Sequence, residues 1–180
     1  MKGRNRGFSL LEISIVLSII GILMGFAIKG KGIIDLAKTK SVTSQIENIR
    51  TAVQIFTEKY GGMPGDISNA DSVLGGVNGR ADGKVASIDD VKRFWSHLAK
   101  SGLISMQLSN GFPTTKLGGL LLLKVDEKGD RWLILCAQNS THSDYKGLIA
   151  EDVAKRLSSG DPTDVLMQKV ADLYIVLFKL

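Results

Sequence analysis

The sequence contains few of the residues that build disulfide frameworks and catalytic centres. It has one cysteine, Cys136, and two histidines among 180 residues. A single cysteine cannot close a disulfide within the chain, and Cys136 lies in an apolar, strand-like run, so we expect a buried thiol. A lone histidine such as His97 is more often packed than bound to a ligand. No nucleophile–base pair is supported by this composition. We therefore expect no catalytic residues, no cofactor and no small-molecule substrate.

Proline and excess charge are scarce as well. The first of three prolines is Pro64, so no proline interrupts a helix before it. The net charge of +5 overstates the basic surface, because three of the 23 Lys and Arg residues lie in the first seven residues and leave 20 against 18 Asp and Glu. No cluster of Lys and Arg with interleaved aromatic residues follows, so we expect no nucleic acid partner.

A long apolar segment occupies the N-terminal region. A short basic leader, residues 1–7, precedes 21 residues, Phe8–Ile28, that are apolar or small and neutral except for Glu12. About 20 apolar residues span a bilayer as a helix, whereas a signal peptide has an apolar core of about 7–15 residues and a small-residue cleavage site. The sequence therefore predicts a single membrane span at 8–28, with its N-terminus in the cytoplasm beside the cations of the leader.

Glu12 is the one charged residue in that span. A charge within the bilayer costs at least ~2.5 kcal/mol by insertion scales, and such residues usually have a function. An ion pair recovers much of this cost only when both partners are present. Glu12 is therefore a candidate functional residue that needs a cation.

The segment Gly7-Phe8-Ser9-Leu10-Leu11-Glu12 resembles the processing site of type IV pilins and type II secretion pseudopilins. The resemblance implies that a membrane aspartyl protease, the prepilin peptidase, cuts between Gly7 and Phe8 and N-methylates Phe8. It also implies that Glu12, at the fifth mature position, pairs with the Phe8 amine of a neighbouring subunit and so fixes the axial offset between helices. The implied location is a bacterial inner membrane, with a periplasmic C-terminal domain and extraction into a filament.

The apolar pattern continues beyond the span as one face of an amphipathic helix. We expect one helix over about 8–60, with 29–60 as its amphipathic continuation. Many family members have a proline near the position of Lys29, and its absence leaves Gly30 and Gly32 as the places where the helix would loosen. The apolar stripe has alternating steps of four and three residues: Val42, Ile46, Ile49, Val53, Phe56 and Tyr60.

Two further segments resemble elements of pseudopilin-like proteins. Tyr60–Asp66 is similar to a Tyr-Gly-x-x-Pro-Gly-Asp element that breaks the chain after the long helix. Phe94–Ile104 is similar to a Trp-x-His-Leu-x-x-x-Gly-Leu-Ile segment. The helix that carries it should begin with Ser87 as its cap, with Asp90 three residues on, and should end at Gly102.

A glycine-rich loop is expected over Asp71–Ser87. Asn78, Asp82 and Asp89 occur there and just beyond it, at offsets that loosely match a calcium-binding loop. Arg80 occupies a position at which such a loop needs an oxygen ligand. A plain polar loop is therefore the favoured interpretation, with calcium as the alternative.

The remaining residues predict antiparallel strands and short helices. Leu120–Val125 and Arg131–Ala137 form an expected hairpin. Leu173–Phe178 is either a last strand or the end of a helix, and its residues favour the strand. A short helix is expected over Leu148–Leu157. The predicted fold class is α+β: a long N-terminal helix, transmembrane in its first half, packed on a small globular domain of residues 61–180.

These features predict a structural subunit. It would be a pseudopilin or minor pilin, processed and assembled at the inner membrane into a helical filament for type II secretion or a type IV pilus. Its expected partners are the membrane, the prepilin peptidase, homologous subunits and the assembly platform. The alternative is a membrane-anchored periplasmic binding domain or enzyme that does not polymerise.

Overall fold

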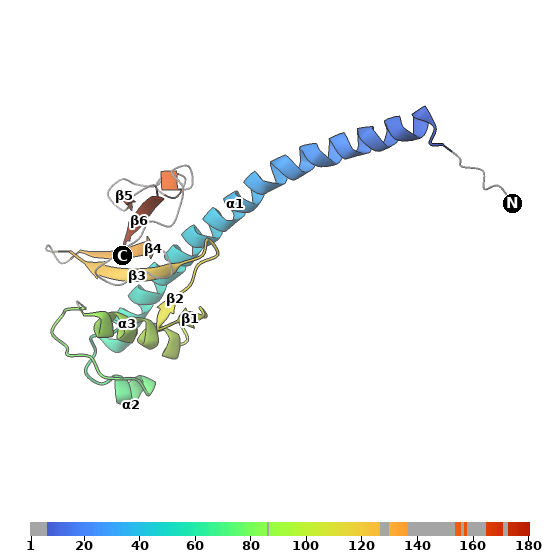
Figure 1. The fold of residues 1–180 in the computed structure, drawn as a ribbon. Coiled ribbons are helices and arrows are strands. Elements are labelled where there is room, and N and C mark those ends of the chain that lie inside the picture. Colours follow the sequence, from blue (N-terminus) through green and yellow to red (C-terminus); the bar gives the residue numbers. More distant parts are fainter. Residues whose placement is uncertain are drawn as a thin grey trace. The chain divides into compact units, whose positions relative to one another are not determined.

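The structure, a computed structural model, describes residues 7–85, 87–126, 130–136, 154–155, 157, 165–170 and 173–180. The chain divides into two compact units, Met1–Ala37 and Lys38–Leu180. Helix α1 (Leu10–Tyr60) contributes to both, and the described strands belong to the second unit (Figure 1). This layout confirms the predicted α+β class, a long N-terminal helix followed by a small domain of antiparallel strands and short helices.

Helix α1 is continuous over 51 residues. It begins after Ser9, whose Oγ accepts a hydrogen bond from the backbone N–H of Leu11 at 3.2 Å and so satisfies one of the free amides of the first turn. It ends at Gly61, whose φ of +69° is the left-handed conformation that glycine adopts without strain. The backbone stays helical through Gly30 and Gly32, so the loosening considered there is not found.

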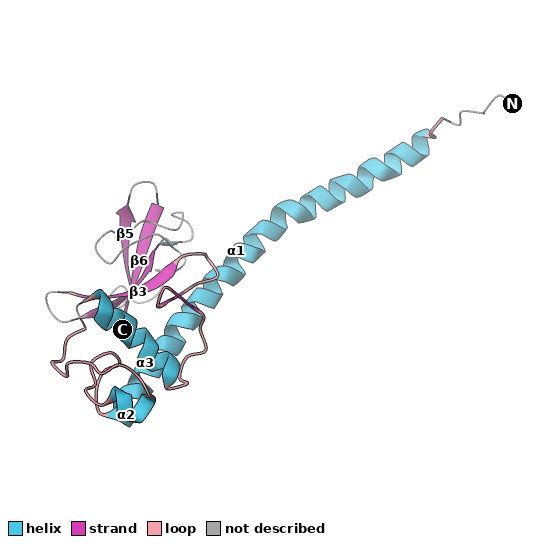
Figure 2. Ribbon diagram, turned by 60° about the horizontal axis from the view of Figure 1, so that its bottom comes forward, coloured by secondary structure: helices cyan, strands magenta, loops and turns pink. Residues whose placement is uncertain are grey.

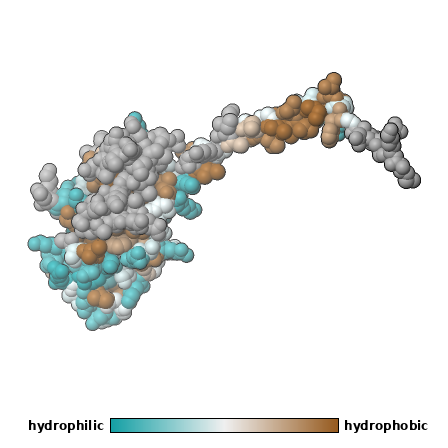
Figure 3. All heavy atoms as spheres, viewed as in Figure 1, coloured by the Kyte–Doolittle hydropathy of each residue, from teal (hydrophilic) through white to brown (hydrophobic). Residues whose placement is uncertain are grey.

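The part of α1 in the first unit exposes apolar side chains along its length. Its most apolar window has a mean hydropathy of 2.4 and none of that window is buried. Among the described residues, α1 is the one helix long and apolar enough to cross a membrane. Figure 3 shows apolar side chains over the visible face of this segment. Such a surface is stable only against lipid or other apolar helices.

The second half of α1 supplies one wall of the core of the second unit, and its predicted apolar stripe is confirmed. Helix α3 (Ile88–Lys100) supplies a second wall. Each large apolar side chain buried here stabilises the fold by about 1.5–3 kcal/mol relative to exposure. The buried members from these two helices are Val42, Ile46, Ile49, Phe56, Val91, Phe94, Trp95 and Leu98.

A four-stranded antiparallel sheet completes this core, with the strand order β3-β4-β6-β5. Figure 2 shows β5 and β6 of this sheet side by side. Consecutive residues in Leu121–Leu123 and Leu133–Leu135 are buried, so both faces of this part of the sheet are covered. The predicted hairpin and last strand are confirmed, and Cys136 is buried as expected. The strands are β3 (Leu120–Val125), β4 (Arg131–Cys136), β5 (Val165–Val170) and β6 (Leu173–Lys179).

A short ribbon of β1 (Leu108–Ser109) and β2 (Phe112–Pro113) precedes the sheet and was not predicted. Two-residue strands are too short to show an alternating pattern in the sequence. The prediction of a helix over Leu148–Leu157 falls mostly outside the described residues, of which 154, 155 and 157 are helical.

Helix α3 begins at the predicted cap. The Ser87 hydroxyl oxygen accepts the Asp90 N–H at 3.1 Å, and the Asp90 carboxylate accepts the Ser87 N–H at 3.0 Å, which forms a capping box. Gly102, with φ of +73°, follows the end of the helix as predicted.

The loop predicted over Asp71–Ser87 is wrong at its start, where a one-turn helix α2 (Ala70–Leu74) forms. Ala70 is completely buried, and the Asn69 carbonyl oxygen accepts two N–H groups of the following turn. Gly75 then ends the helix at a φ of +61°. Burial of one small residue therefore outweighs the local preference for a loop.

Substitution of Gly65 should destabilise the second unit more than substitution of Gly61. Both residues have positive φ, so alanine at either position brings about 1–2 kcal/mol of left-handed strain. A Cβ on Gly61 would meet nothing within 4 Å, whereas a Cβ on Gly65 would lie 2.9 Å from the Asp90 carbonyl oxygen and the Phe94 nitrogen. The clash should add about 1–3 kcal/mol.

Urea unfolding of the full chain in detergent micelles measures both variants. Gly61→Ala is the control for backbone strain. Equal losses for Gly61→Ala and Gly65→Ala would contradict the close packing of Gly65 on α3.

Candidate functional site

The predicted cleavage bond lies in exposed backbone just before α1. Residues 7–9 precede the helix, and the Phe8 side chain is exposed. A Cβ built on Gly7 has no neighbouring atom within 4 Å. Exposed, non-helical segments with small residues are preferred substrates of proteases. The Gly7–Phe8 bond is therefore accessible without unwinding α1.

Glu12 lies in the first turn of α1, three residues after the Ser9 cap. That spacing matches a capping box, and the free amides at a helix N-terminus stabilise a nearby carboxylate by about 0.3–1 kcal/mol. This is less than the ~2.5 kcal/mol or more that a charge costs within a bilayer. No described residue forms an ion pair with Glu12. The helix N-terminus alone therefore does not offset the cost of this carboxylate in a membrane.

The serines near Glu12 do not need a partner from another chain. The Ser14 hydroxyl donates to the Leu11 carbonyl oxygen at 2.8 Å, and the Ser18 hydroxyl donates to the Ser14 carbonyl oxygen at 2.8 Å. Each serine is thus satisfied by its own helix. Their small side chains allow a neighbouring helix to approach closely.

A second cluster of polar contacts joins two loops of the second unit through Asp66. The Asp66 carboxylate is nearly buried and accepts the N–H groups of Asp82 at 3.1 Å and Gly83 at 2.8 Å. The Asp66 carbonyl oxygen accepts the N–H of Ala81 at 2.7 Å. Gly79 packs so closely that a Cβ there would lie 2.4 Å from the Asp66 backbone. Asp66 therefore fixes the glycine-rich segment against the turn that follows α1.

His97 continues this cluster from α3. Its Nδ1 accepts the Gly65 N–H at 2.8 Å, and its Nε2 lies 2.8 Å from the Val77 carbonyl oxygen. A carbonyl oxygen can only accept, so Nε2 carries the proton and the imidazole is neutral. The ring is completely buried and lies nearly parallel to Phe56, with centroids 6.1 Å apart. His97 is thus a packed residue with two backbone partners, as expected for a lone histidine.

Burial lowers the pKa of His97 below its ordinary value of 6.5. The positive charges of Arg93 and Lys100 lower it further, while the hydrogen bond to Val77 acts in the opposite direction. A proton added to Nδ1 would also face the Gly65 N–H and break that bond. The fold therefore holds His97 in its neutral form.

Sequence reasoning missed that these two motif segments meet. Asp66 closes the segment Tyr60–Asp66, and His97 lies in Phe94–Ile104, yet Gly65 and His97 are hydrogen-bonded across 32 residues of chain. The available signal was chemical: an acid and a histidine among glycines and apolar residues need partners when they are buried.

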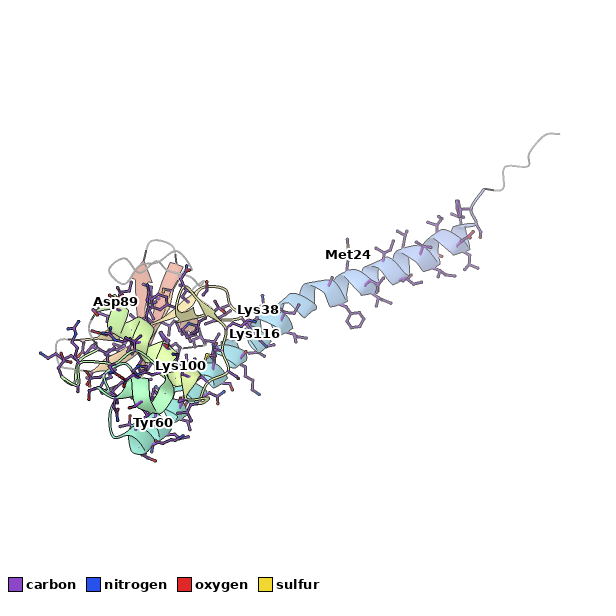
Figure 4. All side chains as sticks on the ribbon, turned by 90° about the horizontal axis from the view of Figure 1, so that it is seen from below. Met24, Lys38, Tyr60, Asp89, Lys100 and Lys116 are labelled. Carbon is purple, nitrogen blue, oxygen red and sulfur yellow. The ribbon has the colours of Figure 1, made fainter. Side chains whose placement is uncertain are left out.

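Two of the calcium candidates, Asn78 and Asp82, accept backbone N–H groups of their own loop. The Asn78 side-chain oxygen accepts the Asp71 N–H at 2.8 Å, and the Asp82 carboxylate accepts the Lys84 N–H at 3.0 Å. Asp89 is exposed in the first turn of α3, at the opposite end of that helix from Lys100 (Figure 4). In the described part of the chain, no group of three or more His, Cys, Asp or Glu side chains is placed to hold a metal ion. A plain polar loop stays the prediction for this segment, with calcium binding as its alternative.

A groove of about 700 Å³ runs between the second half of α1 and residues 103–107 and 114–116. Gln45 lies in its lining, and its Nε2 donates to the Thr114 carbonyl oxygen at 3.1 Å. Among the described residues of the lining, Lys116 is the only ionisable one. General acid–base catalysis requires a positioned proton donor and acceptor, and these described residues include no such pair.

Comparison with known proteins identifies the N-terminal segment. Residues 2–28 match the family model described as the prokaryotic N-terminal methylation motif, the signature of type IV pilins and pseudopilins. No curated protein and no solved structure matches the chain. The match confirms the resemblance found at Gly7–Glu12 and covers the leader and the apolar segment.

Because the folded pKa of His97 lies below 6.5, the unfolded chain binds its proton first as the pH falls. The contribution of neutral His97 to stability is therefore complete above about pH 6.5 and is lost as the pH falls through the folded pKa. We expect the free energy of unfolding to decrease as the pH falls from about 7 to about 5.5, where carboxyl groups of ordinary pKa stay largely ionised.

His97→Phe should flatten this pH dependence and also lower the stability at pH 8, because the Gly65 N–H loses its acceptor. His142→Gln removes the other histidine of the sequence and serves as the control. Urea unfolding at each pH is the measurement. An unchanged slope in His97→Phe would show that another group titrates.

Proposed function

We propose that this chain, which carries the N-terminal methylation signature, is a pseudopilin or minor pilin. It is cut between Gly7 and Phe8 by the prepilin peptidase and assembled at the inner membrane into a helical filament. The filament serves type II secretion or a type IV pilus. The observation that carries the proposal is the match of residues 2–28 to the methylation motif. The accessible Gly7–Phe8 bond ahead of an exposed apolar helix supports it.

The apolar helix supplies the assembly surface. In the first unit its large apolar side chains are exposed, and this exposure extends beyond the predicted span to Ile33, Ile34 and Leu36. Lipid can cover this surface in the membrane, and the helices of neighbouring subunits can cover it in a filament. One helix thus serves both as an anchor and as the contact between subunits.

The ion pair supplies the register. Cleavage creates a cationic amine at Phe8, and methylation leaves its charge in place. When the Glu12 carboxylate of one subunit meets the Phe8 amine of the next, residue 12 lies beside residue 8 of the neighbour. Four residues of helix correspond to an axial shift of about 6 Å. Both charges are then paired in an apolar environment, where breaking a pair by removing one partner costs about 3–5 kcal/mol.

The second unit is the part that faces the periplasm in this proposal. It has its own core around α1, α3 and the sheet, so it does not need the membrane segment to bury its apolar residues. Its surface would contact neighbouring subunits, the assembly platform and the substrate or surface that the filament serves.

The alternative function is a membrane-anchored binding domain or enzyme that does not polymerise. The exposed apolar helix is compatible with an anchor of this kind. The groove beside α1 could hold a ligand, but the described residues that line it include no acid–base pair. Glu12 distinguishes the two functions, because a monomeric anchor has no use for a carboxylate at this depth.

Glu12→Ala should abolish or misalign the contact between neighbouring helices. The expected register places residue i+4 of one subunit beside residue i of the next, so cysteines at Ile20 in one copy and Val16 in another should crosslink in native membranes. In Glu12→Ala this crosslink should fall to background, while cleavage continues because the Gly7–Phe8 bond is intact. Mass spectrometry of the crosslinked peptides identifies the register.

Ser18→Ala is the matched control, because the Ser18 hydroxyl donates to a carbonyl oxygen of its own helix. Cys136 is buried and can be left in place. Equal crosslinking in wild type, Ser18→Ala and Glu12→Ala would show that the carboxylate is satisfied within its own chain and does not set the register.

A further inference from the structure

We propose that Asn110 is a site of spontaneous deamidation in the folded protein, and that Asn78 is protected from the same reaction. Both asparagines are followed by glycine and both are exposed. Glycine offers no side chain to hinder attack by its backbone nitrogen, so the local sequences are nearly equal in reactivity. The two sites differ in the hydrogen bonds and the packing of their reacting groups, and this difference should decide how fast each asparagine reacts.

The reaction needs only water. The Gly111 nitrogen attacks Cγ of Asn110 and forms a C–N bond. The bond from Cγ to Nδ2 breaks, and Nδ2 leaves as ammonia with the proton of the Gly111 N–H. Water then opens the five-membered succinimide at either carbonyl. The products are aspartate or isoaspartate at position 110, and no oxidant or reductant is consumed.

Asn110 and Gly111 form the two-residue turn between β1 and β2, which pair through Ser109 and Phe112. Both turn residues have positive φ, +53° for Asn110 and +89° for Gly111, as in the hairpin turns that favour Asn-Gly. In the structure the Asn110 side chain makes no hydrogen bond to a described residue, and neither does the Gly111 N–H. The electrophile and the nucleophile are thus both unengaged at the tip of the ribbon.

At Asn78 and Gly79, the side-chain amide and the backbone N–H that would react are both hydrogen-bonded. The Asn78 side-chain oxygen accepts the Asp71 N–H at 2.8 Å. The Gly79 N–H donates to the Ile67 carbonyl oxygen at 2.7 Å, and Gly79 packs against the Asp66 backbone. Both hydrogen bonds must break before the Gly79 nitrogen can reach Cγ of Asn78, and the packing resists the movement.

Deamidation of Asn110 would change the contact between the ribbon and α3. Gly111 lies over the Lys92 side chain, since a Cβ on Gly111 would be 3.1 Å from Lys92 Cγ. A new carboxylate at position 110 would therefore arise close to the aliphatic stem of a lysine. Isoaspartate also adds one backbone atom to a two-residue turn, which disturbs the register that buries Phe112.

The test follows the purified full chain in detergent during incubation in mildly alkaline buffer. After proteolysis, mass spectrometry measures the conversion of the amide to a carboxyl group at Asn78 and Asn110 in the same sample. We expect Asn110 to react about tenfold faster than Asn78, because each of the two hydrogen bonds that must break at Asn78 and Gly79 slows the reaction by about two- to tenfold. The same chain in concentrated urea is the matched control, and there the two rates should agree within about threefold, a difference of about 0.7 kcal/mol in barrier height.

Equal rates in the folded protein would overturn the proposal, as would a faster reaction at Asn78. Absence of reaction at Asn110 in the folded chain, with reaction at both sites in urea, would also overturn it, because the turn would then protect the residue. A rate ratio in urea as large as that in the folded protein would assign the difference to the flanking residues and not to the structure.

Discussion

A carboxylate on an otherwise apolar, exposed helix has few stable environments, and Glu12 is placed on such a helix. The helix N-terminus offers it at most about 1 kcal/mol, against at least ~2.5 kcal/mol for a charge within a bilayer. The imbalance is resolved when a cation comes to the same depth. In the proposed function, cleavage at Gly7–Phe8 would create that cation at the Phe8 amine, so that processing of the chain and pairing of Glu12 would depend on each other. The accessible bond before α1 and the apolar surface after it are both consistent with this requirement.

The same helix also organises the second unit, by a different mechanism. There α1 buries one stripe, from Val42 to Phe56, against α3 and the sheet. Beyond Tyr60 the chain must reverse and return to this core, and Gly65, Asp66 and His97 hold the return in place through backbone hydrogen bonds. Polar groups buried among apolar side chains are costly unless they are paired, so these contacts specify one arrangement of the loops.

Structural features that are set by residues close together in the sequence were predictable. Features that are set by contacts between residues far apart in the sequence were not. The stripe on α1, the Ser87–Asp90 cap and the hairpin at Leu120–Cys136 follow from periodicity and local chemistry. Helix α2 was missed because the burial of Ala70 depends on tertiary packing. The bond from Gly65 to His97 was missed because no local pattern links residues 32 positions apart. The β1–β2 turn could have been found, since Asn-Gly is a strong hairpin signal. For the candidate site, the motif located Gly7, Phe8 and Glu12. The proposed pairing of Phe8 with Glu12 involves a second subunit, which a single sequence does not describe.

The central claim is that a processed Phe8 amine meets the Glu12 carboxylate within a filament of such subunits. The most direct test is the mass of the N-terminal peptide of this protein isolated from its native membranes. The account predicts a chain that begins at Phe8 and carries one N-methyl group, with the seven-residue leader absent. A mature pool that still begins at Met1, or at any residue other than Phe8, would remove the cation on which the account depends and would contradict it.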